Sequence, residues 1–419
     1  MIKFYFFIII LSGVIFLGGC SARQVCNSSL HEVNLIQAFN NVKQVLMSEY
    51  ISSINYIPFE TNDSVLIGGI RYNFETDGNY IFVPSGNLQS TIYVFDNNGK
   101  YIKNIGRKGR GPGEYLAVAR MKFYPESNTL MVQGGPKSLF YSFTDGQCIK
   151  QINANDFFDK SYDVVQHYKG MTNILQNISS GGSLYHNDSL YVLAANNTTL
   201  DQYLLLLDSN LTLKSKLDIG KTSLQTGMPD TKLGSIYLYN NTINIISGLY
   251  DTVFTYNYGK LTPHITFNYG KHYSLTTHPL RNRANYYSSK DYSLVSEMCE
   301  VFDLFEVDNA IIGWVNLPKS ISTSKDLEPN SKFIYDKRTR ETRLVKYSNV
   351  DECSAFINDI DGGMPFWPVT LVSNKLYQFV DAGTFIEMSE KYNSTRMKEI
   401  AATLTEESNP IIIEATLKE

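Results

Sequence analysis

The chain has 419 residues and a formal net charge of −4 at pH 7. Proteins built to bind nucleic acid usually display an excess of basic residues, so this balance argues against a nucleic-acid partner. Tyrosine and phenylalanine are frequent, with 29 and 23 copies, and both residue types favour β-strands.

Residues 1–19 have the anatomy of a secretory signal. Lys3 gives a short positive start, residues 4–16 form an apolar run, and small residues precede Cys20 in the sequence LGGC. This arrangement resembles a bacterial lipobox, in which the cysteine is acylated and becomes the new N-terminus. Several acyl chains on one residue anchor a protein stably, so we expect Cys20 to hold the protein to a membrane. The alternative is an ordinary cleaved signal that ends near a cysteine.

The residues after Cys20 read Ser-Ala-Arg-Gln-Val and include no acidic stretch. In bacteria with such lipoproteins, an acidic stretch at this position tends to accompany surface display. We therefore expect a lipid anchor in the bacterial cell envelope, at the outer membrane and facing the periplasm, with residues 20–59 as a lipidated linker. No later segment has the ~18 unbroken apolar residues that a spanning helix needs.

Four more cysteines follow, and an exported chain meets an oxidising compartment in which one or two disulfides can form. Four cysteines allow three complete pairings, and the sequence does not choose among them. No Cys-x-x-Cys pair or histidine spacing suggests zinc. These cysteines are Cys26, Cys148, Cys299 and Cys353.

From residue 60 onward the chain reads as a succession of short strands. Six segments begin with a turn-forming Asn or Asp and continue as an apolar or aromatic run, and they start about 50 to 70 residues apart, a spacing typical of propeller blades. These segments are 79–84, 128–133, 188–194, 241–247, 309–315 and 374–380.

A strand–turn–strand pattern follows five of the six segments. Asn-Gly and Asp-Gly turns, such as Asp145-Gly146, suit tight hairpins because glycine and asparagine tolerate positive φ. Each unit therefore contains an inner strand, an intermediate strand and an outer hairpin, which makes a four-stranded blade. The predicted hairpins are 90–106, 138–152, 202–220, 251–267 and 331–347.

The two ends of the repeat region depart from this pattern. Residues 407–418 read as a strand after a helix over 389–404, and residues 64–74 read as an early strand. These two strands are the obvious segments to complete one blade from both termini, while residues 31–60 run along the surface or add to the closing blade. The sequence thus predicts an all-β fold: a single six-bladed β-propeller of four-stranded blades over residues 60–419, with a short C-terminal helix.

Several motifs are spread over nearly the whole mature chain. They are IYVFDNNGKYIKNIGRKGRGPGEY at 92–115, LYDTVFTY at 249–256, NDIDGGMPFWP at 358–368 and NPIIIEATLK at 409–418. Together with the lipobox, they resemble the six-bladed β-propeller lipoproteins of Bacteroidetes-type bacteria, a group catalogued as a domain of unknown function. The resemblance implies a propeller fold and export. It brings no established activity and no catalytic residues.

The segment GRKGRGPGEY, residues 106–115, looks at first like a phosphate-binding loop. Such a loop needs a Gly-Lys-Ser/Thr ending and a following helix, and a dinucleotide loop needs a βαβ unit; both are missing here. We interpret the segment as a connection between blades in which Glu114 pairs with an arginine. The alternative is a ligand site in which Arg107 and Arg110, with Glu114 beside them, hold a carboxylate or sulfate.

In the sequence NDIDGG, Asp359 and Asp361 alternate as in part of a calcium loop. The further oxygen ligands and the late glutamate of an EF-hand are missing, so an interblade turn is favoured over calcium, and no other cofactor is expected. Trp367 follows closely and either offers a platform to a sugar or packs between blades, which is the default for a buried aromatic residue.

Two long insertions, 153–187 and 271–308, interrupt the repeats, and long loops often carry function. Glu297, Glu300 and Asp303 could act as paired carboxylates in glycoside hydrolysis. Apolar residues are interleaved with them, however, which is typical of an amphipathic segment with a solvated edge. The ligand-binding candidates in the second insertion are Arg281, Arg283, Tyr286 and Tyr287.

The sequence contains no convincing nucleophile–base pair and no Gly-x-Ser-x-Gly elbow. The predicted function is therefore a non-enzymatic one: a binding or scaffolding lipoprotein of the cell envelope for a glycan, a peptide or a partner protein. The alternative is a propeller lyase or hydrolase that acts on an envelope or dietary polymer.

Overall fold

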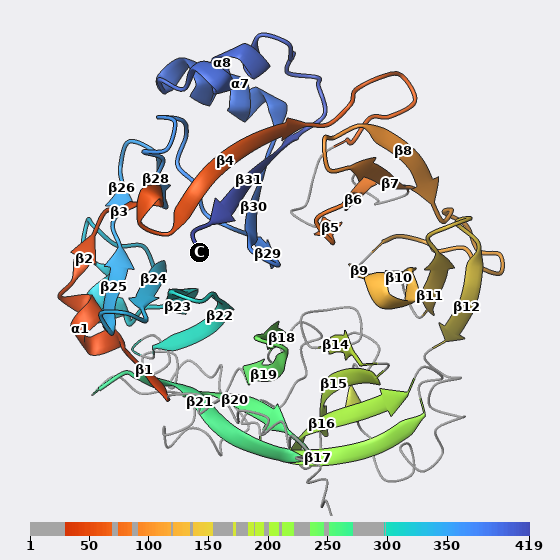
Figure 1. Cartoon of the computed structure of the whole chain (residues 1–419), viewed down its shortest axis with the longest axis horizontal. Coiled ribbons are helices and arrows are strands. Elements are labelled where there is room, and N and C mark those ends of the chain that lie inside the picture. Colours follow the sequence, from red (N-terminus) through yellow and green to blue (C-terminus); the bar gives the residue numbers. More distant parts are fainter. Residues whose placement is uncertain are drawn as a thin grey trace, which may run out of the picture.

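The protein is a ring of six antiparallel β-sheets, each forming one blade (Figure 1). In this computed structural model the strands of each blade follow one another from the centre of the ring to its rim. The arrangement confirms the predicted all-β, six-bladed propeller. The structure describes residues 30–68, 74–85, 91–118, 120–134, 137–153, 171–172, 183–187, 189–196, 201–208, 212–221, 235–246, 251–270, 297 and 299–419.

The first five blades are consecutive in the chain. Blade one holds β5 (Glu75–Thr76), β6 (Tyr80–Ser85), β7 (Thr91–Asp96) and β8 (Tyr101–Ile105), and blade two holds β9 (Arg120–Tyr124), β10 (Thr129–Gly134), β11 (Lys137–Ser142) and β12 (Cys148–Asn153). Blade three holds β13 (Met171–Thr172), β14 (Ser183–His186), β15 (Ser189–Asn196), β16 (Asp201–Asp208) and β17 (Leu213–Lys221). Blade four holds β18 (Ser235–Tyr239), β19 (Thr242–Ile246), β20 (Thr252–Asn257) and β21 (Lys260–Asn268). Blade five holds β22 (Glu300–Glu306), β23 (Ala310–Asn316), β24 (Asn330–Asp336) and β25 (Glu341–Val345).

The six repeated segments of the sequence are the second strands of their blades, namely β6, β10, β15, β19, β23 and β30. The strands nearer the centre are harder to recognise in the sequence, because some of them are very short. β5, for example, has two residues. The five predicted hairpins are also present, as β7–β8, β11–β12, β16–β17, β20–β21 and β24–β25.

Both ends of the chain build blade six. It holds β29 (Thr370–Val372), β30 (Lys375–Val380), β31 (Ile411–Leu417) and, as its outermost strand, β4 (Ile51–Pro58). The predicted C-terminal strand is thus confirmed. The N-terminal strand that pairs with it is β4, and not residues 64–74 as expected. The propeller therefore begins before residue 60. The expectation that residues 31–60 add to the closing blade is the one that agrees with the structure.

The segment before β4 runs along the rim, and we call residues 31–46 the N-terminal belt. It contains β1 (His31–Asn34), α1 (Leu35–Phe39), β2 (Val42–Lys43) and β3 (Val45–Leu46), and a short 3-10 turn (Met47–Glu49) leads into β4. β1 pairs in parallel with β21, and β2 pairs in parallel with β25. The belt therefore covers the outer edges of blades four and five, which would otherwise present unpaired backbone groups.

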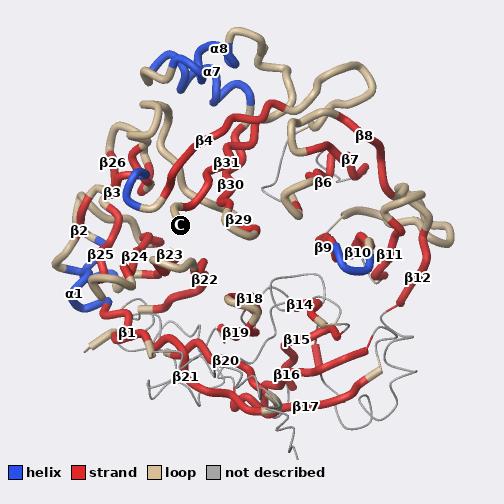
Figure 2. Tube along the Cα trace, viewed as in Figure 1, coloured by secondary structure: helices blue, strands red, loops and turns tan. Residues whose placement is uncertain are grey.

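The C-terminal helix predicted over 389–404 is two helices, α7 (Ala382–Lys391) and α8 (Thr395–Ala401). The break falls where Ser394 caps α8 by accepting a hydrogen bond from the backbone N–H of Met397. Both helices lie at the rim, and α8 contacts β4 (Figure 2). Among the described residues, no helix has the length and apolar character to cross a membrane.

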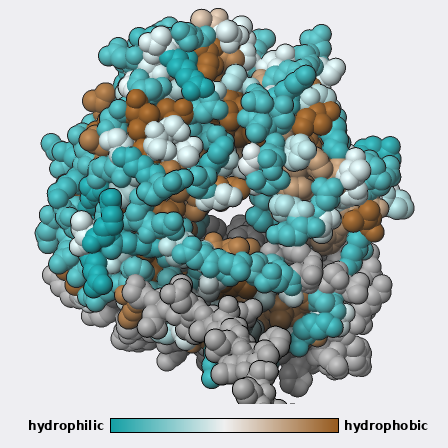
Figure 3. Space-filling view, viewed as in Figure 1, coloured by the Kyte–Doolittle hydropathy of each residue, from teal (hydrophilic) through white to brown (hydrophobic). Residues whose placement is uncertain are grey.

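Neighbouring blades pack through apolar side chains. Val94 of blade one and Leu130 of blade two are fully buried in one cluster, and Ile312 of blade five and Ile413 of blade six are fully buried in another. The described residues on the visible face of the ring are mostly hydrophilic, and the face is hollowed near its middle (Figure 3). The core therefore lies between the blades.

Candidate functional site

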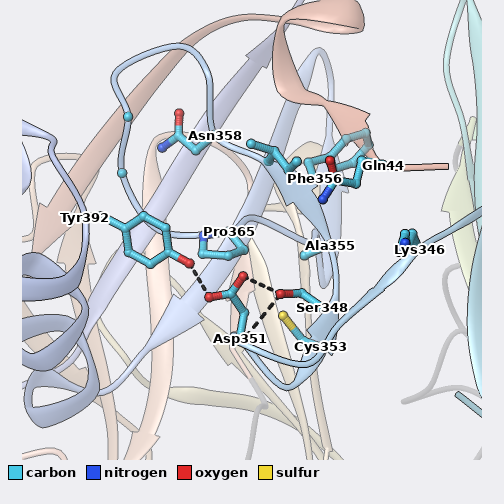
Figure 4. Close-up of a pocket in the computed structure, with 13 residues that line it drawn as sticks. Gln44, Lys346, Ser348, Asp351, Cys353, Ala355, Phe356, Asn358, Pro365 and Tyr392 are labelled. Atoms are coloured by element: carbon cyan, nitrogen blue, oxygen red, sulfur yellow. Dashed lines mark hydrogen bonds between the residues drawn. The ribbon is translucent and has the colours of Figure 1, made fainter. Parts of the chain in front are cut away.

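A pocket of about 330 Å³ lies where blades five and six meet the N-terminal belt (Figure 4). We call it the seam pocket. The volume is at the lower end of the roughly 300–1,000 Å³ that is usual for small-molecule sites. Its lining residues are Gln44, Lys346, Ser348, Asp351, Cys353, Ala355, Phe356, Ile357, Asn358, Gly362, Gly363, Pro365 and Tyr392.

Three distant parts of the chain build this pocket. Gln44 comes from the belt, residues 346–365 connect blade five to blade six, and Tyr392 follows α7. The connection is shaped by a small hairpin of β26 (Tyr347–Ser348) and β27 (Cys353–Ser354), and by β28 (Phe356–Ile357), which pairs in parallel with β3. The pocket therefore exists only when the ring is closed.

Asp351 is the central polar group of the seam pocket. Its Oδ1 accepts hydrogen bonds from Tyr392 Oη and from Lys391 Nζ, the latter at 2.7 Å, while its Oδ2 accepts one from Ser348 Oγ at 2.8 Å. Burial by itself would raise the pKa of this carboxyl, but the hydrogen bonds from Lys391, Tyr392 and Ser348 hold the pKa below its ordinary value. Asp351 is therefore ionised at neutral pH and is matched by the ammonium of Lys391.

The floor of the pocket is apolar. Phe356 is fully buried and stacks on Trp367 with ring centroids 5.3 Å apart. Trp367 in turn meets Trp314 edge-to-face at 5.7 Å, and Lys332 Nζ lies 5.2 Å from a Trp367 ring centroid. Trp367 is thus a wedge between blades five and six, behind the pocket wall, which matches the packing interpretation and leaves no exposed face for a sugar.

Cys353 lines the pocket as a free thiol, and burial raises its pKa. Cys148 and Cys299 are also free, so none of the three described cysteines pairs with another. Cys26 lies outside the described residues, as does the lipidation candidate Cys20.

The loop 106–115 lies between blades one and two, away from the seam pocket. Arg107 Nε donates to Glu114 Oε1 at 2.9 Å, and the backbone N–H of Gly111 donates to Glu114 Oε2 at 2.8 Å. These bonds lower the pKa of Glu114, the Gly111 contact most strongly. Tyr115 is fully buried, and the side chain of Arg110 is exposed. The pairing agrees with the structural interpretation of Glu114 and leaves Arg110 facing solvent.

The two aspartates of NDIDGG do not face a common point. Asp361 Oδ1 accepts from Tyr56 Oη at 3.1 Å and Asn358 Nδ2 at 2.7 Å, and its Oδ2 accepts from Ser394 Oγ at 2.6 Å. Asp359 instead accepts from the backbone N–H of Ser48 at 2.9 Å. The loop thereby joins β4, the blade connection and α8, and within the described part of the chain no cluster of metal-ligating side chains is found.

The remaining ligand candidates, Arg281, Arg283, Tyr286 and Tyr287, lie outside the described residues. Glu300, at the edge of the same insertion, is described. Burial raises its pKa to about 7, although a hydrogen bond with Asn316 works in the opposite direction. Glu300 is the first residue of β22, the strand of blade five that lies nearest the centre of the ring (Figure 1).

A buried ionic cluster between blades four and five was not predicted from the sequence. Glu306, whose side chain is fully buried, accepts hydrogen bonds from Lys337 Nζ at 2.8 Å and Tyr237 Oη at 2.7 Å, and its Oε1 lies 2.8 Å from His264 Nε2. Burial alone would raise the pKa of Glu306, but His264 and Lys337 lower it overall. Tyr237 and His264 belong to blade four, whereas Glu306 and Lys337 belong to blade five. We therefore interpret the cluster as a structural link between the two blades.

Sequence reasoning also missed the seam pocket, because Gln44, Ser348, Asp351 and Tyr392 form no local motif. The turn-forming run around Asp351 is a weak signal that many surface hairpins share.

The profile of a family described as a domain of unknown function, DUF4934, matches residues 30–416. A Bacteroides fragilis structure described as a candidate exported protein has 16% identity and a TM-score of 0.64, over 93% of this chain and 100% of that one. A DUF4221 member from Bacteroides vulgatus has 12% identity and a TM-score of 0.46, over 90% of this chain and 98% of that one. At 16% identity the first similarity concerns the fold alone. No curated protein matches.

Proposed function

The chain belongs to the DUF4934 family, and we propose that it is an exported, lipid-anchored binding protein of the cell envelope that holds its ligand in the seam pocket. Export is supported by the signal anatomy of residues 1–19 and by the description of the Bacteroides fragilis neighbour. The anchor is assigned to acylated Cys20, at the outer membrane and facing the periplasm.

The observation that carries the proposal is the construction of the pocket. A cavity with an apolar floor and a few converging polar groups is the usual form of a small-molecule site. In the described part of the chain its charged side chains are already paired, Asp351 with Lys391 and Lys346 with Asp326 at 3.1 Å. A nucleophile activated by a free base is not formed by these groups, which favours binding over catalysis.

Binding is tested by thermal unfolding of the mature protein with fractions of envelope material separated into neutral glycans, peptides and lipids. A ligand that binds the folded state raises the melting temperature in a concentration-dependent way. We expect one fraction to do so in the wild type and to have little effect on the Ser348→Ala variant, which loses a polar group of the pocket wall. Equal shifts in both proteins, or no shift with any fraction, would contradict the proposal.

The anchor is tested separately by fractionation of cells. Cys20→Ala should release the protein from membranes, whereas Cys26→Ala, the matched control six residues later, should leave it membrane-bound. Membrane association of both variants would exclude Cys20 as the anchor.

A further inference from the structure

The hydrogen-bond donors and acceptors that line the seam pocket favour one class of ligand. We propose that it binds a neutral, polyhydroxylated molecule, such as one or two units of a saccharide. This inference rests on the proposed binding function and makes it specific.

The charged side chains that line the pocket already have partners of opposite charge. The carboxylate of Asp351 is matched by Lys391 Nζ at 2.7 Å, and Lys346 Nζ lies 3.1 Å from Asp326 Oδ1. A charged ligand would have to give up its hydration without gaining an unpaired opposite charge, which is costly. A neutral ligand avoids that cost.

Asp351 and Ser348, which are hydrogen-bonded to each other on the pocket wall, both have unused acceptor capacity. Each carboxylate oxygen has two lone pairs, and within the described residues Asp351 Oδ2 accepts one hydrogen bond, from Ser348 Oγ. Ser348 Oγ uses its own proton in that bond and accepts from the backbone N–H of Asp351 at 3.2 Å, so one lone pair remains on it too. A ligand that satisfies these atoms must supply neutral donors, and hydroxyl groups do so.

Gln44 adds a side-chain amide, which can both donate and accept hydrogen bonds. It is exposed on the belt at the mouth of the pocket, and in the part of the chain that the structure describes its side-chain amide makes no hydrogen bond. An amide both donates and accepts, so it can bind a hydroxyl in either direction. Ala355 and Pro365, which also line the pocket, supply apolar surface against which the C–H face of a sugar ring can pack.

A neutral peptide is the competing ligand, and it is less well matched. A peptide carries one backbone acceptor for each backbone donor, whereas the free atoms of Asp351 and Ser348 all require donors. The strand beside the pocket, β28, is already paired with β3. A peptide therefore finds neither a sheet edge in β28 nor a donor-rich wall.

The test uses saturation-transfer NMR and titration calorimetry on the mature chain. The probes are methyl α-glucoside, methyl β-galactoside, N-acetylglucosamine, maltose, glucuronate and trialanine amide. The variants are Gln44→Ala and, as a matched exposed control on the β11–β12 turn, Gln147→Ala. Loss of one or two hydrogen bonds should weaken binding of a neutral sugar about 3- to 10-fold in Gln44→Ala and leave it unchanged in Gln147→Ala.

Each other outcome overturns the inference in a recognisable way. If trialanine amide or glucuronate binds with the same dependence on Gln44 and the neutral sugars do not, the saccharide inference is wrong while the pocket remains a binding site. If no probe gives a signal that depends on Gln44, the saccharide inference is wrong. If, in addition, no envelope fraction shifts the melting temperature, the proposed binding function is wrong as well.

Discussion

Ile413, near the C-terminus, lies directly opposite Tyr56, near the N-terminus, in the sheet that closes the ring. The hydroxyl of the same Tyr56 donates to Asp361, whose other oxygen accepts from Ser394 at the start of α8. Ring closure is thus secured twice, by the β4–β31 ladder and by one carboxylate that joins three segments.

The Asp361 contact gives the first prediction. Asp361→Ala removes the acceptor of several hydrogen bonds and leaves Asn358 Nδ2 and Ser394 Oγ without this partner, so we expect a loss of about 2–4 kcal/mol in the free energy of unfolding. Urea denaturation measures it. Asp359→Ala, in the same loop but bound to Ser48 at the surface, should cost about 1 kcal/mol or less. Equal losses would mean that Asp361 does not secure the closure.

The second prediction concerns the buried carboxylate between blades four and five. Glu306→Gln leaves the ammonium of Lys337 buried without its counter-charge, which should cost about 3–5 kcal/mol. The control is Glu341→Gln, whose ion pair with Lys43 is about half exposed and should be worth less than ~1 kcal/mol. The same urea midpoint for both variants would contradict the account.

A third prediction concerns pH and follows from Glu300. Its folded-state pKa of about 7 lies above the ordinary value of 4.5, so the folded protein binds more protons than the unfolded chain between these values. Stability therefore falls as pH rises through this window, by at most about 3 kcal/mol. Glu300→Gln should be more stable than the wild type at pH 8 and nearly equal to it at pH 4.5.

Unfolding curves at several pH values, with the exposed Glu407→Gln as control, measure this effect. A difference between Glu300→Gln and the wild type that does not vary with pH would show that Glu300 is not held in a desolvating site.

The fourth prediction separates structure from binding in the loop 106–115. Tyr115 is fully buried between blades one and two, so Tyr115→Ala should cost about 3 kcal/mol or more. Arg110 is exposed, so Arg110→Ala should change stability by less than ~0.5 kcal/mol. Ligand binding at the seam pocket should be the same in Arg110→Ala as in the wild type. A loss of ligand affinity in Arg110→Ala would indicate that the loop 106–115 takes part in binding.

Much of the fold could be predicted because propeller blades repeat. Local patterns such as the run at 374–380 and the Asp145-Gly146 turn carry their own signal, and the C-terminal strand begins with a clear apolar run, residues 411–413. The N-terminal belt could not be predicted in the same way. β1 and β2 are short and pair with β21 and β25, which lie hundreds of residues away, so the register depends on the assembled ring.

The same limit applies to the candidate site. Asp361 attracted notice as a calcium ligand because it alternates with Asp359, yet its partners Tyr56 and Ser394 come from opposite ends of the chain. Gln44 and Asp351 carry no local motif, and the pocket that they share arises from ring closure. Residue types alone identified polar side chains, but they did not show which of these side chains lie together in the folded chain.

Hydrogen exchange, followed by mass spectrometry, tests most directly whether the seam pocket is the binding site. The mature protein is compared with and without a saturating concentration of the neutral saccharide that binds best. We predict slower exchange in residues 44–46, 346–365 and 388–392, with blades one and two unchanged. Protection confined to residues 106–115, with the seam pocket unaffected, would contradict the account.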